Sequence, residues 1–221
     1  FIKYLMKKIA ILISGSGSNM EAIINACKSK EIYGQVVCVI SNDPDAYGLK
    51  RAKRFGINTK VFDHKLYLER DKFDNDLQIF LEELSPDLIV LAGFMRILGS
   101  KITNKFSDKM INLHPSLLPL YPGLNTHDQV LTNKDSIHGI SIHYVSPKLD
   151  GGPLIAQGVI KVKKNEEKNN LIDRIHNIEH ILLPKIINQI CLGNINLVKG
   201  RVIYKDLKST KKGYIQKHYE I

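Results

Sequence analysis

Short apolar runs alternate along this chain with segments of helical periodicity, and this alternation constrains the fold more than any other feature. Four runs are almost wholly aliphatic, at residues 9–13, 36–40, 88–92 and 110–113. Helical patterns such as those at residues 21–27 and 66–84 lie between them. A strand that is apolar on both faces requires a sheet covered on both faces. The alternation therefore predicts an α/β fold, with a doubly wound, mostly parallel sheet and helices on both faces.

The second half of the chain continues with mixed patterns. We expect a short helix at residues 126–131, strands at 139–145 and 154–162, a long helix at 166–191, and one or two strands at 197–204. Pro184 cannot donate to the carbonyl of His180 and should kink the long helix. Without a repeat, a low-complexity linker or a second core, residues 1–221 are expected to form a single domain. Its core would span about 7–192, followed by a C-terminal strand and basic tail at about 193–221.

The chain carries a formal net charge of +10, which favours polyanions or a phosphorylated substrate. The excess comes from scattered lysines, many of them at residues 199–217, and no arginine-aromatic module accompanies them. We therefore expect a small-molecule substrate and no nucleic-acid partner.

The cysteines and the N-terminus indicate a cytoplasmic protein. Cys27, Cys38 and Cys191 are odd in number and form no CxxC pair, so neither a disulfide framework nor a cysteine zinc site is expected. The opening FIKYLMKK is too short in its apolar part for a signal peptide, and Met6 is the expected natural start. No run approaches the roughly 18 apolar residues of a spanning helix, so no membrane partner is expected.

A serine-glycine loop, Ser-Gly-Ser-Gly-Ser-Asn at residues 14–19, joins the first apolar run to a helical pattern. Its small residues would let backbone amides approach an anion at a helix N-terminus, which suits a phosphate. The loop lacks both the Gly-Lys-Ser/Thr ending of a P-loop and the third glycine of a dinucleotide fingerprint, so neither ATP nor NAD is indicated. A plain tight turn is the alternative. Arg70 could add a bidentate contact to the phosphate, or could be an ordinary solvated arginine.

The segment MINLHPSLLPLYPG places Asn112 and His114 two residues apart at the end of an apolar run. Side chains alternate along a strand, so both should point the same way, and Pro115 should turn the chain into a loop. Open parallel sheets bind ligands at the carboxyl ends of their strands. The pair is therefore a candidate site, although a histidine at a strand end is often only structural.

Asp150 lies in Leu-Asp-Gly-Gly-Pro, a turn that can aim its carboxylate. Beside His114 it would favour the imidazolium and give the two residues an acid-base function. We expect His143 to support the site by packing or hydrogen bonding. The spacing of His114, His127 and His143 matches no short zinc motif, so no metal is expected.

These segments together resemble the phosphoribosylglycinamide formyltransferases of purine biosynthesis, from Lys8 to about Glu179. The matching pieces are ISGSGSNMEAII, Ser41-Asn42 with AYGLKRA, LAGFMRIL, INLHPSLLPLYPGLNTH, HGISIHYV and LDGGPLIAQ. The resemblance implies a Rossmann-like formyltransferase fold. It also implies transfer of the formyl group of 10-formyltetrahydrofolate to the amine of glycinamide ribonucleotide, on the route to IMP, through a tetrahedral intermediate.

The resemblance also implies roles for individual residues. The substrate would be held by its phosphate and its glycinamide end, at Gly17, Ser18, Asn19, Arg70 and Glu179. The folate would lie against Met95, Arg96, Ile97, Leu98, Asn112 and Asp150. The catalytic trio would be Asn112, His114 and Asp150. Without the resemblance, residues 95–98 would be interpreted as an apolar helix start packed into the core, and Glu179 as a solvated helix position. The protein would act without a metal, as a monomer or a homodimer.

Three alternatives remain beside this interpretation. Methionyl-tRNA formyltransferase resembles a longer chain with a C-terminal nucleic-acid domain, and formyltetrahydrofolate deformylase usually carries an N-terminal regulatory domain. Neither shows the serine-glycine loop or YPGLNTH. A non-catalytic folate or nucleotide binding module would keep the pocket without the chemistry, but the intact trio argues against it.

Overall fold

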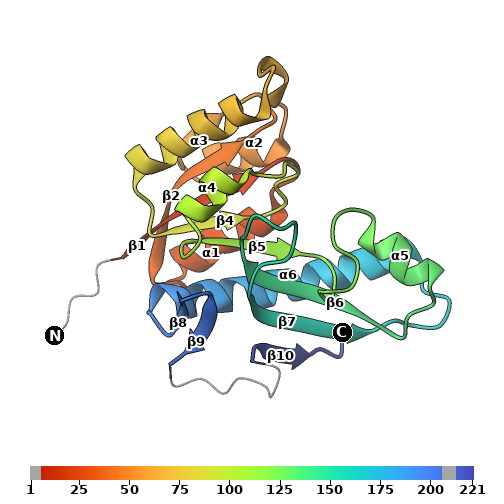
Figure 1. Ribbon diagram of the computed structural model, residues 1–221. Coiled ribbons are helices and arrows are strands. Elements are labelled where there is room, and N and C mark those ends of the chain that lie inside the picture. Colours follow the sequence, from red (N-terminus) through yellow and green to blue (C-terminus); the bar gives the residue numbers. More distant parts are fainter. Residues whose placement is uncertain (1–5, 206–212) are drawn as a thin grey trace.

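The computed structural model describes residues 6–205 and 213–221. Expectations for residues 1–5 and for part of the basic tail, residues 206–212, lie outside this description. The chain forms an eight-stranded sheet in the order β10-β7-β6-β5-β4-β1-β2-β3 (Figure 1). Its strands are β1 (Lys7–Ile13), β2 (Gly34–Ser41), β3 (Thr59–Val61), β4 (Leu88–Leu91), β5 (Met110–His114), β6 (Ile137–Tyr144), β7 (Leu154–Lys161) and β10 (Ile215–His218).

Helices cover both faces of this sheet. They are α1 (Ser18–Lys28), α2 (Tyr47–Arg54), α3 (Arg70–Leu84), α4 (Ser100–Lys105), α5 (Thr126–Thr132) and α6 (Lys168–Cys191), with a 3₁₀ turn at His64–Leu66. A separate hairpin is formed by β8 (Ile195–Val198) and β9 (Arg201–Tyr204). The predicted α/β class and mostly parallel sheet are confirmed. The exception is β6, which runs antiparallel to both of its neighbours.

The first strand shows why its sequence is apolar without interruption. Ile9, Ile11 and Ile13 belong to the core that includes α1 and α6, whereas Ala10 and Leu12 belong to the core that includes α3 and α4. All five are fully buried. Complete burial of an isoleucine contributes about 1.5–3 kcal/mol, so a strand with both faces covered is held strongly. The chain therefore has a hydrophobic core on each side of one sheet.

The strongly periodic segments were predicted correctly, as were the short helix at residues 126–131 and the strands at residues 197–204, but four other short elements were missed. The four aliphatic runs are β1, β2, β4 and β5, and the long helix continues through Pro184 to Cys191. The sequence did not reveal α2, β3, α4 or β10. The helix α2 reads YGLKRAKR and buries three residues, Gly48, Leu49 and Ala52, too few for a clear apolar stripe.

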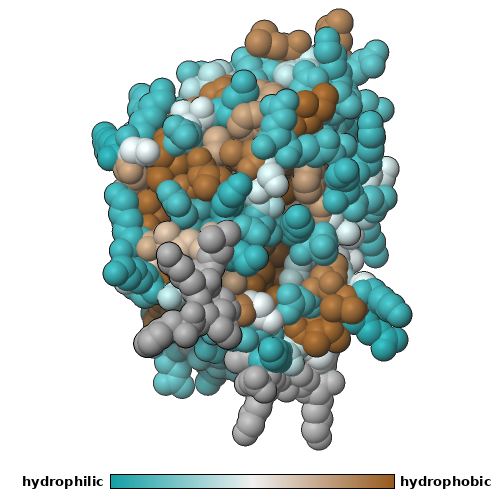
Figure 2. Space-filling model, turned by 90° about the vertical axis from the view of Figure 1, so that its left-hand side faces the viewer, coloured by the Kyte–Doolittle hydropathy of each residue, from teal (hydrophilic) through white to brown (hydrophobic). Residues whose placement is uncertain are grey.

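The face in Figure 2 is mostly hydrophilic, with separate apolar patches between the polar side chains. Within the described ranges, no helix combines the length and apolarity that crossing a membrane requires.

Candidate active site

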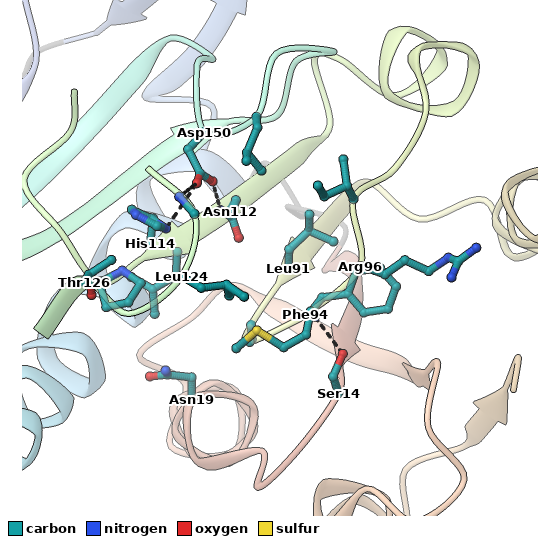
Figure 3. A pocket seen from close by; sticks show the side chains of 18 of the residues that line it. Ser14, Asn19, Leu91, Phe94, Arg96, Asn112, His114, Leu124, Thr126 and Asp150 are labelled. Atoms are coloured by element: carbon teal, nitrogen blue, oxygen red, sulfur yellow. Dashed lines mark hydrogen bonds and ion pairs between the residues drawn. The ribbon is translucent and has the colours of Figure 1, made fainter. Parts of the chain in front are cut away.

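A cavity of about 720 Å³ opens at the carboxyl ends of β1, β4 and β5. Its walls come from the serine-glycine loop after β1, residues 93–98 after β4, residues 123–128 before and within α5, and residues 145–150 after β6. This is the edge at which open α/β sheets bind ligands. Figure 3 shows Asn112, His114 and Asp150 pointing toward one another at one end of this cavity.

The structure brings these three predicted side chains together. The Nδ1 atom of His114 lies 3.5 Å from Oδ2 of Asp150. The Nδ2 atom of Asn112 donates to Oδ1 of Asp150 at 3.3 Å. The side chains of His114 and Asp150 are only 6% and 8% exposed, so water screens their interaction poorly.

Asp150 also accepts a hydrogen bond from outside the trio. The backbone N–H of Gly123 donates to its Oδ2 atom at 2.8 Å. A buried carboxylate is costly unless donors replace its hydration, and Gly123 and Asn112 supply two. The contact also joins the loop of residues 115–125 to the turn that carries Asp150. A backbone N–H can donate whatever the side chain is, so the role of Gly123 could not be predicted from the type of residue.

His143 is the support that the sequence predicted, and the structure gives its mode of action. It stands opposite Asn112 in the antiparallel pairing of β5 with β6. Its Nδ1 donates to the carbonyl of Tyr144 at 2.8 Å, and its Nε2 accepts from Nδ2 of Asn112 at 3.2 Å. Burial lowers the pKa of His143, consistent with a neutral ring that can accept this bond. His143 therefore fixes the orientation of the Asn112 amide.

The serine-glycine loop leads into α1 with the geometry of an anion site. Gly17 has φ 73° and α1 begins at Ser18, with no side chain capping its first amides. A Cβ atom on Gly17 would lie 2.7 Å from the Cα of Gly48, so no larger residue fits there. Asn19 also lines the cavity, and its Nδ2 donates to Oε2 of Glu179 at 2.8 Å.

Glu179 is buried, so its interpretation as a solvated helix position is wrong. It lies on α6 with 4% of its surface exposed, and it lines the cavity. Burial raises the pKa of Glu179 to about 7, while the hydrogen bond from Asn19 opposes that rise. A cationic group placed in the cavity would therefore favour the ionised form of the Glu179 carboxyl group.

Residues 95–98 form a loop before α4 and are not the start of a helix. Leu98 packs into the core, but Met95 and Ile97 are 69% and 52% exposed beside the cavity. The guanidinium of Arg96 lies 4.2 Å from the centre of the Phe73 ring, and Figure 3 shows its side chain pointing away from the trio. The hydroxyl of Ser14 accepts from the backbone N–H of Met95 at 2.7 Å, which ties this loop to the serine-glycine loop.

Arg70 is the one predicted site residue that does not line the cavity. It begins α3, and its Nε atom lies 3.7 Å from Oδ2 of Asp74 on the same helix. No group of three or more His, Cys, Asp or Glu side chains in residues 6–205 and 213–221 is arranged to hold a metal ion.

Comparison with known proteins gives one consistent result. The formyl transferase family model matches residues 7–187. The phosphoribosylglycinamide formyltransferase of Escherichia coli is 39% identical over 206 residues, which cover 93% of this chain and 97% of that protein. The human trifunctional purine biosynthetic protein adenosine-3 is 39% identical over 86% of this chain, a match that spans 19% of the human protein. The structure of the Coxiella burnetii phosphoribosylglycinamide formyltransferase superposes with a TM-score of 0.90 at 40% identity, over 96% of this chain and all of that one.

Proposed function

This chain belongs to the formyl transferase family, and from that premise we propose how it transfers a formyl group to the amine of phosphoribosylglycinamide. The family resemblance found in the sequence is confirmed, and the enzyme class follows from relatives that match nearly the full length of both chains. The observation that carries the mechanism is the convergence of Asn112, His114 and Asp150 at one end of the cavity.

The nucleotide substrate would bind with its phosphate at the N-terminus of α1. Free amide groups at Gly17 and Ser18 and the helix dipole favour a dianion there. The glycinamide end would reach Glu179, whose carboxylate can pair with an amine. Arg70 was predicted to assist the phosphate, but its contact with Asp74 supports a role outside this pocket.

The formyl donor would be 10-formyltetrahydrofolate, bound along residues 95–98. Exposed apolar side chains are costly in water and gain from covering a flat ring system, and Met95 and Ile97 offer such a surface. Asn112 and Asp150 would meet the formyl end of the same molecule. The folate is a substrate of the reaction, and no metal takes part in the proposed mechanism.

In the first step the substrate amine attacks the formyl carbon. A carbon–nitrogen bond forms, and the carbonyl electron pair moves to the oxygen. The imidazolium of His114 and the amide of Asn112 would stabilise this oxyanion. The contact from Asn112 to Asp150 is long at 3.3 Å, so a formyl oxygen placed beside this N–H would compete with the carboxylate for it.

In the second step the tetrahedral species collapses. The bond from carbon to the folate nitrogen breaks, its electron pair stays on that nitrogen, and the nitrogen takes up a proton. The attacking amine gives up a proton, so the reaction as a whole is neutral. Asp150 would face His114 and relay these protons with it, directly or through a water molecule.

The test is an acceptor comparison with purified protein and 10-formyltetrahydrofolate. We expect tetrahydrofolate to form with phosphoribosylglycinamide, and formylation of methionyl-tRNA or hydrolysis without an acceptor to be slower by orders of magnitude. Folate binding without turnover would instead establish the non-catalytic module. The cytoplasmic location of the protein and its monomeric or homodimeric state stay predictions, to be checked by fractionation and by light scattering.

A further inference from the structure

The ring of His114 is held from the side opposite Asp150. Its Nε2 atom lies 2.8 Å from the backbone carbonyl oxygen of Tyr121, whereas its Nδ1 atom faces Asp150 at 3.5 Å. A carbonyl oxygen only accepts hydrogen bonds, so the Nε2 atom must carry a proton whether the ring is neutral or charged. The contact therefore leaves Nδ1 as the nitrogen that gains and loses a proton.

The carbonyl that makes this contact belongs to a residue in a strained conformation. Tyr121 has φ 53°, a left-handed geometry that is disfavoured for a bulky residue and needs support from its surroundings. The loop sequence is Leu-Tyr-Pro-Gly, so its glycine lies two residues after Tyr121 and not at the strained position itself. The direction of the carbonyl consequently depends on what holds the Tyr121 side chain.

The phenol of Tyr121 is anchored on the turn that follows α5. Its hydroxyl donates to Oδ2 of Asp135 at 2.6 Å and accepts from Nδ2 of Asn133 at 2.7 Å. A hydrogen bond to a carboxylate is among the stronger ones in proteins. A side chain outside the cavity thus fixes the backbone group that touches His114.

We propose that Tyr121 is a positioning residue for formyl transfer, which selects the Nε2-protonated form of His114 through a phenol tethered to Asp135 and Asn133. The inference rests on the proposed function for its kinetic consequence. Its structural part, the proton position on the imidazole, is independent of any substrate.

The kinetic test compares Tyr121→Phe and Asp135→Ala with the wild type. Tyr121→Phe removes both hydrogen bonds of the tether and Asp135→Ala removes the one to the carboxylate, and neither residue lines the cavity. We expect kcat to fall about tenfold or more, because small displacements of a catalytic group are costly, with KM for both substrates unchanged within about twofold. Asp135→Asn keeps an acceptor for the phenol and should retain most of the activity. The double variant Tyr121→Phe/Asp135→Ala should be no slower than the slower single variant, because both remove one tether.

The spectroscopic test uses protein labelled with ¹⁵N-histidine, at a pH at which the His114 ring is neutral. We expect the proton on Nε2 in the wild type and a mixture of both forms in Tyr121→Phe. The matched control is Tyr47→Phe, which removes a half-exposed phenol on α2 and should change neither kcat nor the spectrum. Thermal unfolding verifies that each variant is folded.

Two results would overturn the proposal: a proton on Nδ1 in the wild type, or a Tyr121→Phe variant with wild-type kcat and an unchanged proton position. A failure of the proposed function looks different, because wild-type protein would then give the expected spectrum without formylating phosphoribosylglycinamide.

Discussion

The Asp150 carboxylate is the residue on which most contacts of the site converge. Gly123, Asn112 and His114 all face its two oxygens within 3.5 Å. We expect Asp150→Asn and His114→Ala each to lower kcat by about 100-fold or more, the usual cost of losing such a group. Circular dichroism and thermal unfolding should show a folded protein, since neither side chain belongs to the hydrophobic cores. Turnover near that of the wild type in either variant would refute the assignment.

Glu179 makes stability depend on pH in a direction opposite to that of most carboxylates. Burial raises its pKa from 4.5 to about 7, so the folded state favours the protonated form. This contribution is complete below about pH 4.5 and is lost as the pH rises through 7. Glu179→Gln should therefore be more stable than the wild type at pH 8, by on the order of 2–4 kcal/mol, and nearly equal to it at pH 4.5.

Melting temperatures at these two pH values measure the effect, and several degrees are expected at pH 8. The exposed Glu83 on α3 provides the control, because Glu83→Gln should shift both melting temperatures little and equally. A Glu179→Gln variant that is less stable than the wild type at pH 8 would contradict the argument.

The sequence predicted the side chains of the site better than their contacts. Asn112 and His114 were identified because a strand alternates its faces and a proline ends it, a rule that needs no tertiary information. Such rules do not predict which residues contact Asn112 and His114. His143 meets Asn112 only because β6 runs antiparallel to β5, and Tyr121 acts through a backbone atom.

At the scale of elements, α5 and β6 are joined by a partly buried histidine, His127, and a buried one, His138. Nδ1 of His127 lies 3.0 Å from Nε2 of His138, and burial lowers their pKa values from 6.5 to about 4 and about 3. Because the folded state favours neutral rings, their contribution is complete above about pH 6.5 and is lost as the pH falls through 4. The wild type should therefore lose stability steadily over this range.

The variant His138→Gln can still hydrogen bond to His127 but does not titrate at this position. We expect its melting temperature to fall less than that of the wild type between pH 7 and pH 4. The exposed His218 on β10 provides the comparison, and His218→Gln should follow the wild type. Equal losses in wild type and His138→Gln would show that the pair is not the titrating element.

The elements that bury the most apolar surface were the easiest to predict. The strands β1, β2, β4 and β5 are buried on both faces and stand out as aliphatic runs, whereas β10 has two partly buried and two exposed residues. The direction of β6 was not predictable, because its apolar pattern is the same for parallel and antiparallel pairing. Short helices such as α4, with six residues, bury too few side chains to show a period.

At the scale of the whole molecule, Arg174 connects α6 with the segment that follows β7 and with the C-terminus. From α6 it donates to Oε1 of Glu166 at 2.5 Å, to the carbonyl of Lys161 at the end of β7, and to that of Ile221 at the C-terminus. Its side chain is 12% exposed and that of Glu166 only 2%. Removing one partner of a buried pair costs about 3–5 kcal/mol.

We therefore expect Arg174→Ala to lower the free energy of unfolding by about that amount, measured by urea denaturation. Lys105→Ala is the control, because it breaks an ion pair with Glu82 whose side chains are 54% and 40% exposed, so water screens the pair and its loss should change the free energy of unfolding little. Similar losses in both variants would contradict the special role of Arg174.

The pairing register of β5 with β6 restricts how relatives of this chain can diverge. Asn112 lies opposite His143, and a slip of one position would replace that imidazole by the side chain of Ile142 or Tyr144. Lengthening or shortening residues 115–136 is harmless only when β6 returns in the same phase. The segment between the two strands can thus change in length and composition only where Tyr121, Gly123, Asp135 and the cavity-lining residues 123–128 keep their places, and only if the alignment of β5 with β6 is kept.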